Sequence, residues 1–271
     1  MCALLELGTA LHPYRDSIVL VGGWVPYFLL DDHRGPDRDF RHVGSIDIDL
    51  AVDPGTVDSQ GYAEIVELIM ERGYRQRKSE NGDTIPFSHS KKVKSPADAK
   101  EYSIQVDFLT QADPNAGKKH RHRKVQPGLQ ARIALGCEIA FGHNYRRKLS
   151  GILPGNGETT LELRLLDIAG CIGMKGIALG ERYREKDAYD IFSVVGKCLD
   201  GPVSVANKVK PYSNEAGIKR GLDNIREKFR SQRAEGPSWV AAFLSDDPEE
   251  RKRINAEAYI AVTDFIKALD E

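Results

Sequence analysis

The stretch "VGSIDIDLAVD", residues 43 to 53, places two aspartates where a strand is expected. Apolar and mainly acidic residues alternate from Ile46 to Val52, which is the two-residue period of a strand with one apolar face. Aspartate is depleted in strands, and Asp47 and Asp49 leave the same face. Two such carboxylates repel each other unless a cation neutralises them, and hard oxygen ligands suit Mg²⁺. The alternative is the solvated outer face of an edge strand.

A third aspartate interrupts a later apolar run. Asp107 lies in "VDFLT", residues 106 to 110, with Val106 and Phe108 on the opposite strand face. If this strand returns beside the first, three carboxylates meet. Such a group can hold one or two Mg²⁺ ions that bind nucleotide phosphates and activate an attacking oxygen. The alternative for Asp107 alone is a surface-facing strand residue.

The stretch "VLVGGWVPYFLL", residues 19 to 30, predicts a buried strand, a glycine pair and a helix. Glycine lets a backbone approach phosphates, and a helix N-terminus offers unpaired N–H groups and a positive dipole. Gly22 and Gly23 therefore predict a phosphate site, although the pattern is neither a P-loop nor the dinucleotide-binding fingerprint. The alternative is a simple turn.

The order of these motifs resembles the nucleotidyltransferase superfamily of the DNA polymerase beta type, and within it the AbiEii-like toxin nucleotidyltransferases. The resemblance spans about residues 17 to 195. Arg41 lies four residues before Ser45, further than in the family pattern. The matching residues are Gly22, Gly23, Arg41, Ser45, Asp47, Asp49, Asp107, Lys175, Lys186, Asp187 and Asp190.

The resemblance implies a fold, a reaction and a role for each residue. The fold is α+β: a polymerase-beta-like core on a small mixed sheet, followed by helices. The reaction moves an NMP from an NTP to an acceptor hydroxyl and releases pyrophosphate. The implied acceptor is an RNA, such as a tRNA 3′ end, in a toxin–antitoxin setting with an antitoxin as partner. Asp47, Asp49, Asp107 and Lys175 are the implied catalytic residues, with the aspartates as metal ligands, while Gly22, Gly23, Ser45, Lys186, Asp187 and Asp190 bind the nucleotide.

Lys175 also stands out without the resemblance, because a lysine inside the apolar helix "CIGMKGIAL" needs a partner if it is buried. Lys186, Asp187 and Asp190 fall within one helical turn. A lysine here can pair with nucleotide phosphates as a point charge. The alternatives are a solvated, salt-bridged helix face, and aspartates that serve mainly to orient Lys175.

A basic loop, "KKHRHRK", follows the Asp107 strand at residues 118 to 124. Such a loop in a protein of net charge −1 predicts a nucleic-acid contact. A solvated loop, or zinc bound by His120 and His122, are the alternatives. The predicted acceptor-binding residues are Lys118, Lys119, Arg121, Arg123 and Lys124.

The rest of the chain defines the architecture. The Gly- and Pro-rich "GILPGNGE", residues 151 to 158, predicts a boundary between a core at 1–155 and a helical domain at 156–271. "CEIAFG" is predicted to be a strand and "LELRLLDIAGCIGMKGIAL" a helix. The four cysteines have no zinc-ligand spacing.

The start of the chain shows no signal peptide and no apolar segment approaches a membrane span, so we expect a cytoplasmic protein. Two other functions stay open. One is a nucleotidyltransferase for a small molecule of the aminoglycoside type, and the other is a non-catalytic nucleotide-binding module. Mg²⁺ is the expected cofactor and an NTP the expected substrate, whether the acceptor is an RNA or a small molecule.

Overall fold

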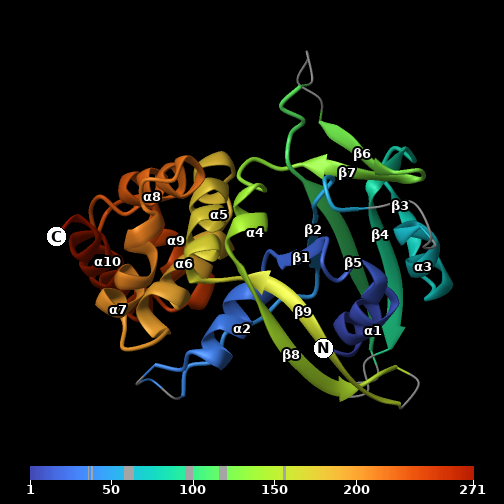
Figure 1. Ribbon diagram of the computed structural model, residues 1–271. Helices are drawn as coiled ribbons and strands as arrows, with labels where there is room; N and C mark the ends of the chain where they lie inside the picture. The colour runs from blue at the N-terminus through green and yellow to red at the C-terminus, as the bar shows by residue number, and fades with distance from the viewer. Residues whose placement is uncertain (36, 38, 58–63, 95–99, 116–120, 155–156) are drawn as a thin grey trace. The chain divides into compact units, whose positions relative to one another are not determined.

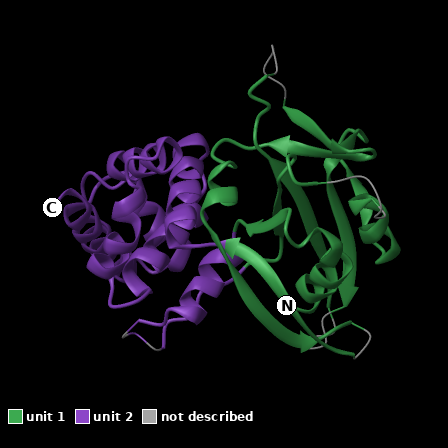
Figure 2. Cartoon of the chain, in the orientation of Figure 1, with its two compact units in different colours: residues 1–22, 45–165 green, residues 23–44, 166–271 purple. Residues whose placement is uncertain are grey.

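A computed structural model describes the chain except for residues 36, 38, 58–63, 95–99, 116–120 and 155–156. The chain folds into two compact units (Figure 2). The first unit contains residues 1–22 and 45–165, and the second contains residues 23–44 and 166–271. The second unit therefore takes in an N-terminal helix and loop together with the C-terminal helices.

The first unit is built on one mixed sheet (Figure 1). Its described strands run in the order β3-β4-β5-β2-β1-β9-β8, and β7 attaches the β6–β7 hairpin to the end of β5. The pairs β2–β5 and β1–β9 are parallel, whereas β1–β2, β3–β4 and β4–β5 are antiparallel. The strands are β1 (Ile18–Val21), β2 (Ile48–Val52), β3 (Arg75–Lys78), β4 (Thr84–Lys94), β5 (Glu101–Thr110), β6 (His122–Gln126), β7 (Leu129–Ile133), β8 (Asn144–Ile152) and β9 (Glu158–Leu166).

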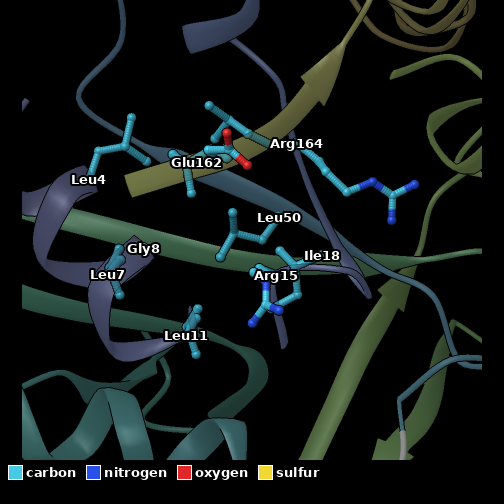
Figure 3. Close-up of a pocket in the computed structure, with 11 residues that line it drawn as sticks. Leu4, Leu7, Gly8, Leu11, Arg15, Ile18, Leu50, Glu162 and Arg164 are labelled. Atoms are coloured by element: carbon cyan, nitrogen blue, oxygen red, sulfur yellow. The ribbon is translucent and has the colours of Figure 1, made fainter. Parts of the chain in front are cut away.

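One face of this sheet is covered by α1 (Cys2–Ala10), whose buried leucines pack against it. Lys91 of β4 pairs with Glu6 of α1 at 2.8 Å and fastens the helix to this face. A small, mainly apolar pocket between α1 and the sheet is lined by Leu4, Leu7 and Leu50, among others (Figure 3). Because side chains alternate along a strand, Asp49 lies on the face opposite Leu50 and away from this pocket. The remaining short helices of the unit are η1 (His12–Tyr14), α3 (Ile65–Glu71) and α4 (Ile139–Gly142).

The second unit is helical. Helices α5 and α8 pack backbone to backbone, since a Cβ on Gly176 would lie 2.3 Å from the carbonyl oxygen of Gly221. None of its helices, and none elsewhere in the described part of the chain, has the length and apolar composition needed to cross a membrane. The helices are α2 (Trp24–Asp32), α5 (Ile168–Glu181), α6 (Glu185–Lys197), α7 (Pro202–Val209), η2 (Lys210–Tyr212), α8 (Ala216–Lys228), α9 (Glu235–Leu244) and α10 (Pro248–Asp270).

The predicted α+β class, with a mixed sheet followed by helices, is confirmed. Several predicted elements are wrong. The segment "CEIAFG" contains the short helix α4 and no strand. The segment "LELRLL" belongs to strand β9 and is not helical; its leucines at 161, 163 and 165 alternate with Glu162 and Arg164. That is a two-residue period.

The boundary between the first unit and the C-terminal helices lies at the end of β9. The stretch "GILPGNGE" joins β8 to β9 within the first unit, which runs on to Leu165. The division of the chain into independent domains at 1–155 and 156–271 stays a prediction. The strand that carries the aspartates begins at Ile48 and not earlier, and the side chain of Ile46 is 54% exposed.

Candidate functional site

Asp49 and Asp107 lie side by side on neighbouring strands. Strands β2 and β5 are parallel, and their register pairs Ile48 with Val106 and Asp49 with Asp107. Paired residues of adjacent strands project from the same face of a sheet. Ile48 and Val106 are buried on the other face, whereas both aspartates are half-buried. The sheet thus brings together two of the three predicted carboxylates.

The turn after β1 lies against one of these carboxylates. Val21 is the register partner of Asp49, and Gly22 follows with φ of +74°. A Cβ built on Gly22 would lie 2.0 Å from Oδ2 of Asp49. Glycine is therefore required twice, for the left-handed backbone and for the space that the carboxylate occupies. Gly23 is the residue before α2, so the predicted strand–Gly-Gly–helix order is confirmed.

Asp107 is held by Gln105 and Ser88, with Arg77 behind Ser88, and none of the three is a candidate from the sequence. Gln105 donates from Nε2 to both carboxylate oxygens at 2.9 Å, and Ser88 Oγ donates to Oδ1 at 2.5 Å. Arg77 Nη1 in turn donates to Ser88 Oγ at 3.2 Å. Gln105, two residues before Asp107, could have been found from the strand period. Ser88 and Arg77 could not, because their approach depends on the pairing of β3 and β4 with β5.

Asp47 and Ser45 precede the strand. Asp47 lies in a bend and is exposed, and Ser45 is half-buried. Among the described residues, no three or more His, Cys, Asp or Glu side chains form a group that could hold a metal ion, so Asp47 does not join the other two aspartates in such a group. Mg²⁺ usually keeps several waters and takes one or two carboxylates together with substrate phosphates. Asp49 and Asp107 fit that mode of binding, and the three-aspartate metal site stays a prediction.

Lys175 lies in a buried charge cluster within the second unit. Its side chain is 10% exposed and pairs with Asp187 at 3.1 Å and also with Asp190. Arg182 donates to Asp187 from Nε at 2.8 Å. Burial alone would lower the pKa of Lys175, but Asp190 and Asp187 outweigh it and raise that pKa above its usual value. Burial likewise favours a higher pKa for Asp187, and Lys175 and Arg182 reverse this and hold it below its usual value.

Helix α6 also holds the peptide at residues 42–44. His42 Nε2 lies 2.9 Å from Asp190 Oδ1, with both side chains fully buried. The Gly44 N–H donates to Nδ1 of His42 at 3.0 Å. Because Nδ1 accepts this bond, the ring proton is assigned to Nε2, which donates to Asp190. Tyr189 stacks on the His42 ring and accepts the N–H of Val43 at 3.2 Å.

Through these contacts, residues that the sequence predicts to bind nucleotide stabilise the fold of the second unit. Lys186 Nζ donates to the Gly44 carbonyl at 2.7 Å, Asp190 accepts from His42, and Asp187 compensates Lys175. The hypothesis that the aspartates mainly orient Lys175 agrees with this geometry. The nucleotide-binding roles of Lys175, Lys186, Asp187 and Asp190 stay predictions. His42 was missed, because a single histidine in a polar loop carries no sequence signal.

Of the predicted acceptor-binding residues, Lys118 and Lys119 lie outside the described residues, as does His120. Arg121 and Lys124 are exposed at and within β6. Arg123 donates to the carbonyl oxygens of Gln111 and Ala112 at 3.5 and 3.4 Å. The segment from His122 is thus a strand and not the predicted loop.

No model of a protein family matches the sequence, and no curated protein matches it. Among solved structures, the chain is similar to the crystal structure of JHP933 from Helicobacter pylori, with 11% identity and a TM-score of 0.39 over 98% of this chain and 90% of that chain. It is also similar to the crystal structure of a "putative nucleotidyltransferase from H. pylori", with 9% identity and a TM-score of 0.27 over 98% and 96% of the two chains. Both TM-scores are low.

Proposed function

We propose that this protein is a nucleotidyltransferase that moves an NMP from an Mg–NTP to an acceptor hydroxyl. The observation that carries the proposal is the pairing of Asp49 with Asp107 beside the Gly22 turn. Two half-buried carboxylates on one sheet face suit a divalent cation better than they suit solvent. The sequence resemblance to the polymerase-beta-type superfamily supports the same chemistry.

The chain's own residues supply orientation, charge and a proton acceptor. Asp49 and Asp107 would provide oxygen ligands for a Mg²⁺ ion, which would supply neutralisation of the phosphate charge and activation of the attacking oxygen. Asp107 takes the proton of the acceptor hydroxyl as the new O–P bond forms, and the bond between the α-phosphate and pyrophosphate breaks. Gln105 and Ser88 hold the Asp107 carboxylate in one orientation. Gly22, Gly23 and Ser45 bind the phosphates of the NTP, and Asp47 would be a further ligand of the metal ion.

We propose an RNA as acceptor, in particular a tRNA 3′ end, in a toxin–antitoxin setting with an antitoxin as the partner protein. The support is the resemblance to AbiEii-like toxins and the basic residues at β6, namely Arg121 just before the strand and Arg123 and Lys124 within it. A small-molecule acceptor is the second candidate. Labelled NTPs incubated with total RNA, and separately with a panel of aminoglycosides, distinguish the two by the product that carries the label.

The variant Asp49→Asn tests the metal site, because it removes a negative charge but little volume. We expect it to abolish transfer and to remove the rise in melting temperature that Mg–NTP gives the wild-type protein, while the melting temperature without ligand stays nearly unchanged. Asp83→Asn, an exposed carboxylate in the β3–β4 turn, is the matched control and should retain both properties. Wild-type transfer rates in Asp49→Asn would exclude the proposed site.

A further inference from the structure

Arg77 of β3 lies one hydrogen bond beyond the residues that hold Asp107. Its Nη1 donates to Ser88 Oγ at 3.2 Å, and that hydroxyl donates to Asp107 at 2.5 Å. The distance between Nη1 of Arg77 and Oδ1 of Asp107 is therefore at most the sum of these two hydrogen-bond lengths. Arg77, Ser88 and Asp107 come from three neighbouring strands of the first unit.

Within the described part of the chain, Arg77 forms no direct ion pair, and the Asp107 carboxylate lies behind the Ser88 hydroxyl. The side chain is half-buried, and among the described residues its hydrogen bond to Ser88 is the contact that it makes, with no carboxylate in ion-pair range. Lys91, also half-buried, pairs with Glu6 at 2.8 Å. A guanidinium has five N–H donors in a fork that matches phosphate, and a partly desolvated cation is stabilised by an anion. An anionic ligand at Arg77 would therefore have charge and hydrogen-bond donors to bind to.

We infer that Arg77 binds a phosphate of the acceptor whose hydroxyl lies at Asp107, so that the acceptor is the end of a single-stranded polynucleotide. This inference rests on the proposed function. A nucleotide carries its phosphate and hydroxyls on one sugar, only a few bonds apart. A hydroxyl placed at Asp107 thus brings its own phosphate within reach of the guanidinium. An aminoglycoside carries several ammonium groups and would be repelled by Arg77.

Strand β6, which pairs with β7, carries further positive charge. The ring of His122 in β6 lies 5.3 Å from the ring of Phe87, the residue before Ser88. Arg121 and Lys124, close to His122 in sequence, are exposed. A polynucleotide that ends at Asp107 would find further cations along β6, whereas a mononucleotide would not need them.

The test measures RNA binding separately from transfer. The probe is a short single-stranded RNA with a fluorescent 5′ label, and anisotropy gives its affinity over a salt series without NTP. We expect Arg77→Gln to weaken binding about 5- to 10-fold and to reduce the slope of log affinity against log salt by about 0.7, the value for one single-strand phosphate contact. Lys78→Gln, the adjacent exposed cation of β3, is the matched control and should change both quantities much less. Arg77→Lys should restore the slope but only part of the affinity.

Each other result has a defined meaning. Equal effects of Arg77→Gln and Lys78→Gln, or no RNA binding by the wild-type protein, would overturn the inference. Loss of stabilisation by Mg–NTP in Arg77→Gln would overturn it as well, because Arg77 would then belong to the NTP site. RNA binding through Arg77 in a wild-type protein that Mg–NTP fails to stabilise would instead refute the proposed nucleotidyl transfer and leave a polynucleotide-binding site.

Discussion

The contact between Gly22 and Asp49 allows the candidate site to be tested by a single methyl group. In Gly22→Ala the new Cβ would lie 2.0 Å from Oδ2 of Asp49, although real Cβ atoms do not come closer than 3.0 Å to a neighbour. The carboxylate must therefore move by about 1 Å or more, a displacement that can cost about 100-fold in rate. The backbone at φ +74° adds a cost of about 1–2 kcal/mol, and the displaced Asp49 rotamer about 0.5–1.5 kcal/mol.

The control separates these costs. Gly82 has φ of +85°, and a Cβ on this residue would have no atom within 4 Å, so Gly82→Ala carries the backbone cost without the clash. Urea unfolding of both variants gives the difference in unfolding free energy, and nucleotidyl transfer with Mg–NTP gives the rate. We expect Gly22→Ala to be less stable than Gly82→Ala and to lose about 100-fold in rate, while Gly82→Ala keeps its rate. Equal stability and equal rates of the two variants would refute the position of Asp49 beside the turn.

Two further predictions concern the residues behind the site. Lys175→Met should cost about 3–5 kcal/mol in urea unfolding, because it leaves Asp187 and Asp190 buried with less compensation, and adding Asp190→Asn should recover part of this loss; an unchanged midpoint would contradict the buried network. Because the pKa of Asp187 is lowered, its contribution to the free energy of unfolding is complete above the usual pKa of 3.8 and is lost as the pH falls through the lowered pKa. Because the pKa of Lys175 is raised, its contribution is complete below 10.5 and is lost only as the pH rises through the raised pKa. Without Lys175, burial pushes the pKa of Asp187 up in the variant, so the difference in the free energy of unfolding between wild type and Lys175→Met should shrink as the pH falls from neutral towards about pH 4. Gln105→Ala should lower the transfer rate about 10- to 100-fold with an unchanged KM for RNA, because Gln105 orients a carboxylate that is proposed to bind the metal. The control is Gln76→Ala, which changes an exposed glutamine on β3. Equal transfer rates of the two variants would show that Gln105 does not act through Asp107.

The sequence predicted the parts of this fold that depend on local pattern. The alternation around Asp49 and Asp107, and the glycines after a buried strand, indicated two strands and a turn that the structure confirms. The register that pairs Asp49 with Asp107 was only a hypothesis, because strand pairing is set by contacts distant in the chain.

Local pattern failed where two periods compete. The apolar run that continues from "LELRLL" into the following segment predicts one helix, although Leu161, Leu163 and Leu165 alternate with charged residues. Arg77, Ser88 and His42 carried no signal, because each acts through a partner that lies in another element. The lone lysine at 175 did indicate a buried charge, and its partners Asp187 and Asp190 were among the candidates.

The attachment of residues 42–44 to α6 has a consequence for synthesis of the protein on the ribosome. His42, Val43 and Gly44 bind side chains that lie 148, 146 and 142 positions further along the chain. Closing so long a loop costs entropy before its contacts form, and contacts of high sequence separation slow folding. The peptide that leads into Ser45 and Asp47 therefore stays unanchored until α6 has been translated. A nascent chain that ends before α5 could pair β2 with β5, but its Asp-x-Asp segment would lack the anchor on its N-terminal side.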